Sequence, residues 1–108
     1  MKLKANLIID ILKNQIEREG VPFYLEKRGD KDAGAIFIKH DLMDGFIHVY
    51  HRVYNSLGEK KFQFFDVFDE DSVGKFFKKQ KAFDSDLWII EIEARNYELK
   101  KLFSKLGL

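Results

Sequence analysis

The 108-residue sequence contains no cysteine, so disulfide bridges, zinc–thiolate sites and cysteine nucleophiles are excluded. A chain without cysteine suits a reducing cytosol, and we expect a cytoplasmic protein. No apolar run approaches the ~18 residues of a membrane-spanning helix, so no membrane association is expected. Near the N-terminus, Asp10 interrupts the apolar run and no small-residue cleavage site follows, which argues against a secretory signal.

An excess of charge is also missing, because 19 Lys and Arg residues face 18 Asp and Glu residues. Proteins that hold nucleic acid by its phosphates usually carry a clear basic excess, so the overall charge does not favour that class. Apolar residues make up 45% of the chain, and phenylalanine alone occurs 11 times. We expect one domain over residues 1–108 with a single hydrophobic core.

Hydrophobic periodicity predicts three helices and five strands. Apolar residues spaced three and four apart from Leu3 to Ile16 predict the first helix. The signals for helix ends are Gly20 after the first helix, Asp69 to Ser72 before the second, and Asn96 and Gly107 around the third. The predicted strands cover residues 23–28, 33–40, 46–55, 61–68 and part of 83–95.

Short turns between the strands favour an antiparallel sheet with helices packed on it. The prediction is an α+β fold with a mostly antiparallel five-stranded sheet and the element order α-β-β-β-β-α-β-α. Residues 23–28 and 33–40 are predicted to pair as a hairpin. Gly34 lacks bulk, which predicts a close approach to the backbone there, most simply by a helix. The strand within 83–95 is apolar on both faces at first, so we expect it inside the sheet.

Two segments resemble the signatures of a bacterial family, the domain of unknown function 1491. The first is KRGDKDAGAIFIK (Lys27–Lys39), and the second is FDSDLWIIEIEAR (Phe83–Arg95), where an aromatic-acidic turn precedes a Leu-Trp strand. Lys2-Leu3-Lys4 also fits the family's helix start, although Ser85 stands where proline is usual. The resemblance spans nearly the whole chain and implies a short, single-domain protein, mostly of alphaproteobacteria. It implies no known activity, cofactor or catalytic residue.

Three histidines, His40, His48 and His51, fall on neighbouring predicted strands and raise the question of a metal site. His48 and His51 are three apart in one strand, so their side chains point to opposite faces. At most two histidines converge, with Asp41 or Asp44 as a further ligand, whereas structural metal sites need about four placed ligands. The pattern favours isolated histidines, and no metal or other cofactor is expected.

Carboxylates occur at the end of the last strand, where Glu91 and Glu93 share a face with Arg95 and Asp86 lies on the other face. Side chains two apart on a strand are roughly 7 Å apart, which is compatible with paired acid–base chemistry. The alternative is a solvated strand end that pairs with a neighbouring cation such as Lys39. No second catalytic element accompanies the carboxylates, which favours the ion-pair interpretation.

The turn Gly29–Gly34, which includes Asp30 and Asp32, has glycines at both ends and the cations Lys27, Arg28 and Lys31 nearby, so an anion or phosphate cradle is one interpretation. Glycine-rich phosphate loops normally lead from a strand into a helix N-terminus. A strand follows this turn instead, so no helix dipole contributes. A plain turn is the favoured interpretation.

One face of the 46–55 strand interleaves aromatic and basic residues, namely Phe46, His48, Tyr50, Arg52 and Tyr54. Platforms for single-stranded nucleic acid combine these residue types. An aromatic stripe on a sheet is more often core beneath a helix, or a surface for a protein partner. Three predicted helices are available to cover it.

These patterns together favour a small non-catalytic module with a protein-interaction or regulatory role, whose partner is another protein or a second copy of itself. Binding of RNA or single-stranded DNA through Tyr50, Arg52 and Tyr54 is the alternative. A small enzyme that uses the carboxylates of the last strand is a further alternative, and it requires the two signature segments to meet around a cleft. The candidate binding residues are Arg28, Asp30, Asp32, His48, Tyr50, Arg52, Tyr54, Glu91, Glu93 and Arg95.

Overall fold

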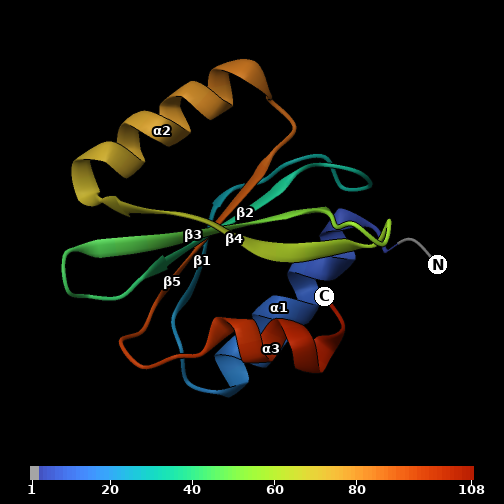
Figure 1. Cartoon of the computed structure of the whole chain (residues 1–108), viewed down its shortest axis with the longest axis horizontal. Coiled ribbons are helices and arrows are strands. Elements are labelled where there is room, and N and C mark those ends of the chain that lie inside the picture. Colours follow the sequence, from blue (N-terminus) through green and yellow to red (C-terminus); the bar gives the residue numbers. More distant parts are fainter. Residues whose placement is uncertain (1–2) are drawn as a thin grey trace.

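The structure, a computed structural model, describes residues 3–108 of the chain, so Lys2 lies outside the described residues. Over this range it contains three helices and five strands in the predicted order (Figure 1). The elements are α1 (Ala5–Arg18), β1 (Phe23–Lys27), β2 (Ile36–Asp41), β3 (Phe46–Tyr54), β4 (Lys60–Asp69), α2 (Glu70–Phe83), β5 (Trp88–Glu93) and α3 (Leu99–Leu106). None of these three helices has both the length and the apolar character needed to cross a bilayer.

The strands form one mixed, mostly antiparallel sheet in the order β1-β5-β2-β3-β4. β5 lies between β1 and β2, antiparallel to β1 and parallel to β2. The predicted hairpin between residues 23–28 and 33–40 is therefore wrong, whereas β2–β3 and β3–β4 pair as hairpins. The reason lies in β5, whose residues Ile89 and Ile90 are both fully buried on opposite faces. A strand that is apolar on both faces is best buried inside a sheet, and this outweighs the local pairing.

Helices cover both faces of the sheet, with α1 and α3 on one face and α2 on the other (Figure 1). The larger core lies between the sheet and α1 and α3, and receives Trp88, Ile90 and Ile92 of β5. The smaller core lies under α2 and receives Leu87 and Ile89. This alternation confirms that the strand within residues 83–95 is internal.

Most of the predicted helix ends are confirmed. Gly20 after α1 has φ 78° and Gly107 after α3 has φ 69°, and both lie in the left-handed region that favours glycine. α2 begins with a capping box, in which the Asp69 carboxylate accepts the Ser72 amide and the Ser72 hydroxyl accepts the Asp69 amide. Local sequence signals therefore decide these ends.

The predicted cap of the third helix at Asn96 is wrong. α3 begins at Leu99, after Glu98, and no side chain caps it. Leu99 and Leu102 are both buried in the larger core. The helix therefore starts where its apolar residues can be buried, and this burial outweighs the capping preference of asparagine.

The Gly29–Gly34 turn and the start of β5 are in direct contact, an arrangement that we call the Trp88 joint. A Cβ on Gly29 or Gly34 would overlap the Asp86 carbonyl oxygen and would lie 2.6 or 2.9 Å from Cδ1 of Trp88. The Trp88 indole N–H donates to the Asp30 carbonyl at 2.7 Å, and the Asp30 amide donates to the Asp86 carbonyl at 2.8 Å. The predicted close approach at Gly34 is confirmed, but a strand makes it instead of a helix, because β5 enters the sheet there.

Replacing Gly34 by alanine should destabilise the protein, since the new methyl group would overlap backbone and a buried indole, neither of which can rotate away. We expect a loss of about 1–3 kcal/mol in the free energy of unfolding, as in overpacked cores. Gly74→Ala is the matched control, because an added Cβ there has nothing within 4 Å. In the interior of α2 the same change should stabilise by about 0.5–1 kcal/mol. Urea denaturation followed by circular dichroism measures the stability of both variants. Equal changes in the free energy of unfolding would contradict the close contact at Gly34.

Candidate functional site

The aromatic and basic face of β3 is partly core and partly surface. Tyr50 is 5% exposed and its ring lies 5.6 Å from that of Phe103 in α3. Phe46 and Tyr54, at the two ends of the strand, are 53% and 60% exposed. α1 and α3 thus cover the middle of this face and leave its ends open. Of the predicted stacking platform, the two ends are exposed, His48 and Arg52 are partly exposed, and Tyr50 is buried.

The neighbouring edge strand β4 exposes further aromatic residues that the sequence interpretation missed. Opposite β3, Val49 pairs with Asp66 and Tyr50 with Phe64, so Phe65 is the extra residue of a β-bulge. The Phe64 ring packs beside Tyr50 on the α3 side of the sheet, whereas the Phe65 ring packs beside Phe76 of α2 on the other. The sequence Phe-Gln-Phe-Phe-Asp-Val-Phe of residues 62–68 breaks the regular alternation of a strand, and this break was the available signal for the bulge.

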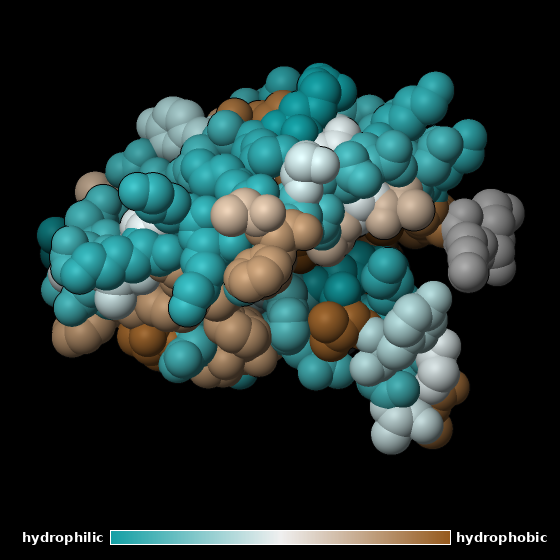
Figure 2. All heavy atoms as spheres, turned by 90° about the horizontal axis from the view of Figure 1, so that it is seen from above, coloured by the Kyte–Doolittle hydropathy of each residue, from teal (hydrophilic) through white to brown (hydrophobic). Residues whose placement is uncertain are grey.

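Three apolar residues are exposed on the α3 side of β4 and of the adjoining end of β3, and we call them the β4 rim. The rim consists of Phe46, Phe64 and Val67, each at least 40% exposed, whereas the equally exposed Phe65 lies on the α2 side of the sheet. Figure 2 views the molecule from the α2 side and shows apolar residues gathered along one margin of that side, whereas the rim lies on the other side of the sheet. The three rim residues belong to neither core cluster, although the Phe64 ring packs beside those of His48 and Tyr50.

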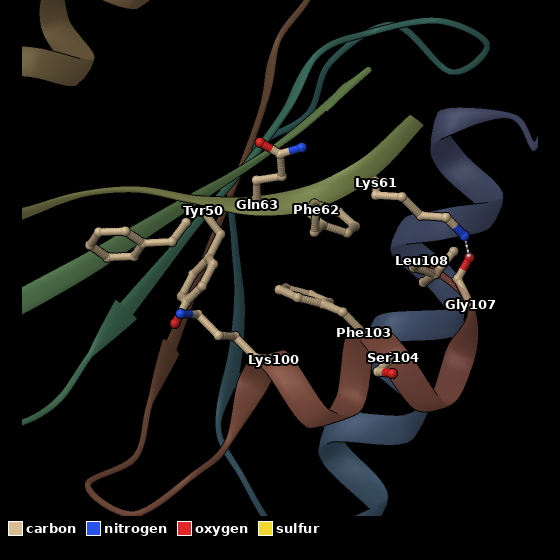
Figure 3. Close-up of a pocket in the computed structure, with 10 residues that line it drawn as sticks. Tyr50, Lys61, Phe62, Gln63, Lys100, Phe103, Ser104, Gly107 and Leu108 are labelled. Carbon is tan, nitrogen blue, oxygen red and sulfur yellow. Dashed lines mark hydrogen bonds between the residues drawn. The ribbon is translucent and has the colours of Figure 1, made fainter. Parts of the chain in front are cut away.

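A groove of about 510 Å³ lies beside the rim, between β4 and α3 (Figure 3). The stacked rings of Phe62 and Phe103, 4.6 Å apart, form part of its wall. Lys100 Nζ lies 5.5 Å from the ring centroid of Phe64, and Lys61 donates to the Gly107 carbonyl at 2.8 Å (Figure 3). The groove therefore has apolar walls and cationic side chains.

A second cavity, of about 680 Å³, lies between the start of α1, the end of the Gly29–Gly34 turn and the end of the β3–β4 hairpin. Three residues predicted from the sequence, Asp32, Arg52 and Tyr54, line it together. We call it the Arg52 cavity. Because these residues come from separate segments of the chain, only the fold brings them together.

The polar groups of the Gly29–Gly34 turn mainly hold the fold. The Asp30 carboxylate accepts the amides of Asp32 and Ala33 at 3.1 and 2.9 Å. The Arg28 guanidinium lies 5.5 Å from the centroid of the Trp88 ring, a cation–π contact. Two predicted site residues, Arg28 and Asp30, therefore stabilise the Trp88 joint.

The carboxylate Glu91 of β5 belongs to a half-buried ion cluster on the α2 side of the sheet. Lys39 Nζ lies 2.7 Å from Glu26 and 3.3 Å from Glu91, so the ion-pair interpretation is confirmed for Glu91. Burial raises the pKa of Glu91, and Lys39 opposes this rise. Burial lowers the pKa of Lys39, but the two carboxylates together outweigh burial and raise it. Glu93 is partly exposed and Arg95, beyond the strand, is exposed.

The two signature segments do meet in space, through Asp86 and the Trp88 joint. Glu91 and Glu93, however, lie at the other end of β5, opposite Lys39 and Asp41 of β2. A cavity of about 360 Å³ beside the joint is lined by Arg28 and Trp88 but by neither glutamate. The two segments therefore meet in a packing contact that does not include Glu91 or Glu93.

Comparison with known proteins identifies the family of this chain. The family model described as protein of unknown function (DUF1491) matches residues 3–100, which include both signature segments. The chain belongs to the DUF1491 family. The resemblance inferred from the two segments is thereby confirmed. No curated protein matches the chain.

Solved structures share the fold of this DUF1491 protein. A solution structure from A. tumefaciens is 27% identical, with 90% of each chain covered and a TM-score of 0.75. A crystal structure of a DUF1491 family protein from Caulobacter crescentus is 23% identical, covers 87% of this chain and 90% of its own, and has a TM-score of 0.77. An NMR structure of a DUF1491 family protein from Caulobacter crescentus is 24% identical, covers 89% of each chain and has a TM-score of 0.70.

The histidines of this DUF1491 protein lie as the strand spacing predicted. His40 and His48 are cross-strand neighbours, whereas His51 lies on the opposite face beside Phe65. His40 is buried, and its Nε2–H donates to the Ala94 carbonyl at 2.8 Å. Within residues 3–108, no three His, Cys, Asp or Glu side chains are grouped so as to hold a metal ion.

Stability should fall below about pH 6.5, the usual pKa of an unfolded histidine. Burial lowers the folded-state pKa of His40 and of His51, so the unfolded chain binds their protons first as the pH falls. Their neutral forms therefore stabilise the fold above this pH, and the stabilisation is lost as the pH falls towards the folded pKa.

His40→Gln tests this dependence, because glutamine can still donate to the Ala94 carbonyl but does not titrate. The variant should lose less free energy of unfolding than the wild type between pH 7 and pH 5.5, and a second change, His51→Gln, should flatten the dependence further. Urea denaturation across this pH range measures it. Equal pH slopes in the wild type and the double variant would show that these histidines do not govern it.

Proposed function

We propose that this protein is a non-catalytic interaction module that holds an apolar segment of a partner protein against the β4 rim and the adjoining β4–α3 groove. The observation that carries the proposal is the exposure of Phe46, Phe64 and Val67 on the same side of the sheet as a groove with aromatic walls. Single exposed apolar residues are ordinary, but contiguous aromatic surface is typical of protein interfaces. The partner is expected in the cytosol, as the absence of cysteine suggests.

The charges around the groove favour a segment with acidic residues beside its apolar ones. Lys61 and Lys100 line the groove, and the exposed Lys101 and Lys105 lie on the same helix, α3. A carboxylate next to an apolar anchor could pair with Lys100 while the anchor packs on Phe64. Such pairs at the edge of an interface speed association and select the partner more than they add affinity.

Strand addition is a less suitable mode of binding, because the outer edge of β4 is partly closed. The Phe62 amide donates to the Leu108 carbonyl at 2.8 Å, and the Val67 amide donates to the Asp66 carboxylate at 2.8 Å. The bulge at Phe65 further interrupts the edge. Recognition is therefore proposed to run through side chains and the groove.

Single-stranded nucleic acid suits this surface less well than a peptide. Tyr50, one of the three residues first considered for base stacking, is buried under α3. The rim also runs into acidic residues at the end of β4 and the start of α2, namely Asp66, Asp69, Glu70 and Asp71. A phosphate backbone that followed β4 would meet these carboxylates, which oppose its binding.

Substitution of the rim should abolish partner binding without unfolding the protein. The test compares Phe64→Ser/Val67→Ser with Tyr24→Ser/Leu25→Ser, a control pair of similar exposure on the opposite edge strand, β1. Each variant is used for affinity capture from the source bacterium, and the captured protein is then titrated by calorimetry. We expect the rim variant to bind at least about thirtyfold more weakly, as for a hot spot of about 2 kcal/mol, and the control to bind like the wild type.

Two results would contradict this proposal. One is equal loss in the rim and control variants, which would assign binding elsewhere. The other is RNA as the bound species, with binding lost on Arg52→Gln and retained in the rim variant.

Light scattering of the purified protein tests whether the partner is a second copy of this chain. A dimer that dissociates in the rim variant would identify the occupant as another copy.

A further inference from the structure

The Arg52 cavity has the size and lining of a small-molecule site. Its volume of about 680 Å³ lies within the roughly 300–1,000 Å³ of ligand pockets. Its lining includes the apolar residues Ile8 and Ile36, which belong to the larger core, and polar side chains from three separate segments. It shares Lys61 and Gly107 with the β4–α3 groove but contains no residue of the β4 rim.

Arg52 is the distinctive group in this cavity. Its side chain is half-buried, and its Nε is shielded from solvent without a hydrogen-bond partner among residues 3–108. None of the ion pairs within the described residues involves Arg52, and its guanidinium instead lies 5.8 Å from the centroid of the Phe62 ring. Burial lowers the pKa of Arg52. A partly desolvated cation without a carboxylate is unfavourable, and an anion in the cavity would relieve that penalty.

The other charges of the lining leave Arg52 without compensation. The cavity is lined by the cations Lys4, Arg52, Lys60 and Lys61 and by the carboxylates Asp32 and Glu59. Asp32 pairs with Lys4 at 3.6 Å, so it is already engaged. The result is a cavity whose lining carries more positive than negative charge and includes the Arg52 guanidinium.

The start of α1 also lies at this cavity and adds a positive potential. Its first amides are not free donors, because those of Ala5 and Asn6 donate to the carbonyls of Asp32 and Lys31. The helix therefore strengthens the attraction for an anion, while the specific contact has to come from side chains.

We propose that the Arg52 cavity binds a small phosphorylated molecule whose phosphate pairs with Arg52. A guanidinium presents parallel N–H groups that match two oxygens of one phosphate, and Lys60 is a further cation in the lining. The volume far exceeds that of a phosphate group alone. The exposed ring of Tyr54, with Lys60 Nζ 5.7 Å from its centroid, offers a face for the rest of the ligand.

A small ligand suits this site better than a nucleic-acid strand. The carboxylates Asp32 and Glu59 line the same cavity and would repel a backbone that continued past it. Arg52 is half-buried beside the core residues Ile8 and Ile36, so a compact phosphate can reach it more readily than an extended polymer.

Titration of the ¹⁵N-labelled protein with inorganic phosphate, at matched ionic strength against chloride, tests the anion site directly. Millimolar phosphate should shift the amide signals of Gly34, Tyr54 and Gly58, which line the cavity. Adenosine 5′-monophosphate should shift the same signals at lower concentration, whereas neutral adenosine should not. Failure of both phosphate compounds to shift these signals would overturn the proposal.

Variants then assign the anion to Arg52. Arg52→Gln should weaken binding of the monophosphate by about ten- to a hundredfold, as expected for loss of charge-assisted hydrogen bonds. Arg52→Lys keeps the charge without the paired N–H groups and should bind with intermediate affinity. Arg95→Gln, at an exposed position outside the cavity, is the matched control and should bind like the wild type. Equal binding by all four proteins would overturn the assignment.

Two further arms separate this site from the other candidates. The rim variant Phe64→Ser/Val67→Ser should bind the monophosphate normally, so failure of the proposed partner binding would leave this result intact. A single-stranded oligoribonucleotide should bind no more tightly than the monophosphate. Much tighter binding of the oligonucleotide, lost on Arg52→Gln, would replace the small-molecule site by a nucleic-acid site.

Discussion

The Trp88 joint is the contact on which the rest of the fold depends. The indole N–H of Trp88 and the backbone of Asp86 are paired with Asp30, while Gly29 and Gly34 lie so close that neither position has room for a side chain. A buried indole needs a hydrogen-bond acceptor, and the turn supplies one at the point where β5 enters the sheet. The same turn supplies the carbonyls that accept the first amides of α1. One loop thus fixes the helix, the central strand and the tryptophan together.

The central place of β5 explains the layout of the remaining elements. Because β5 is apolar on both faces, helices are needed on both sides of the sheet, and α1, α3 and α2 provide them. The chain returns to the middle of the sheet through α2, so β4 is left as an outer strand. No helix fully covers the rim of that strand, which explains why phenylalanines remain exposed in a chain with ample means to bury them.

The two proposed surfaces are close neighbours with different chemistry. The β4–α3 groove has aromatic walls, whereas the lining of the Arg52 cavity has more cations than carboxylates and includes a guanidinium without an ion-pair partner among residues 3–108. They meet at Lys61, whose ammonium is held by the Gly107 carbonyl.

The sequence by itself determined the elements and several of their ends. Apolar periodicity specified the helices and strands, and Gly20, Asp69 and Gly107 ended or began helices through their own backbone or side-chain chemistry. The spacing of His48 and His51 was enough to put them on opposite faces, and the glycine at position 34 was enough to announce a close contact. These features depend on neighbours a few residues away, so they can be read from local sequence.

Only the tertiary structure decided which strands pair and which polar residues meet. The pairing of β1 with β5 replaced the expected hairpin because burial of β5 on both faces outweighs a local turn. The same long-range packing buried Tyr50, left Phe64 and Phe65 exposed on either side of a bulge, and joined Arg52 and Tyr54 to Asp32 in one cavity. Such outcomes depend on residues distant in the chain competing for the same core, and local patterns do not encode that competition.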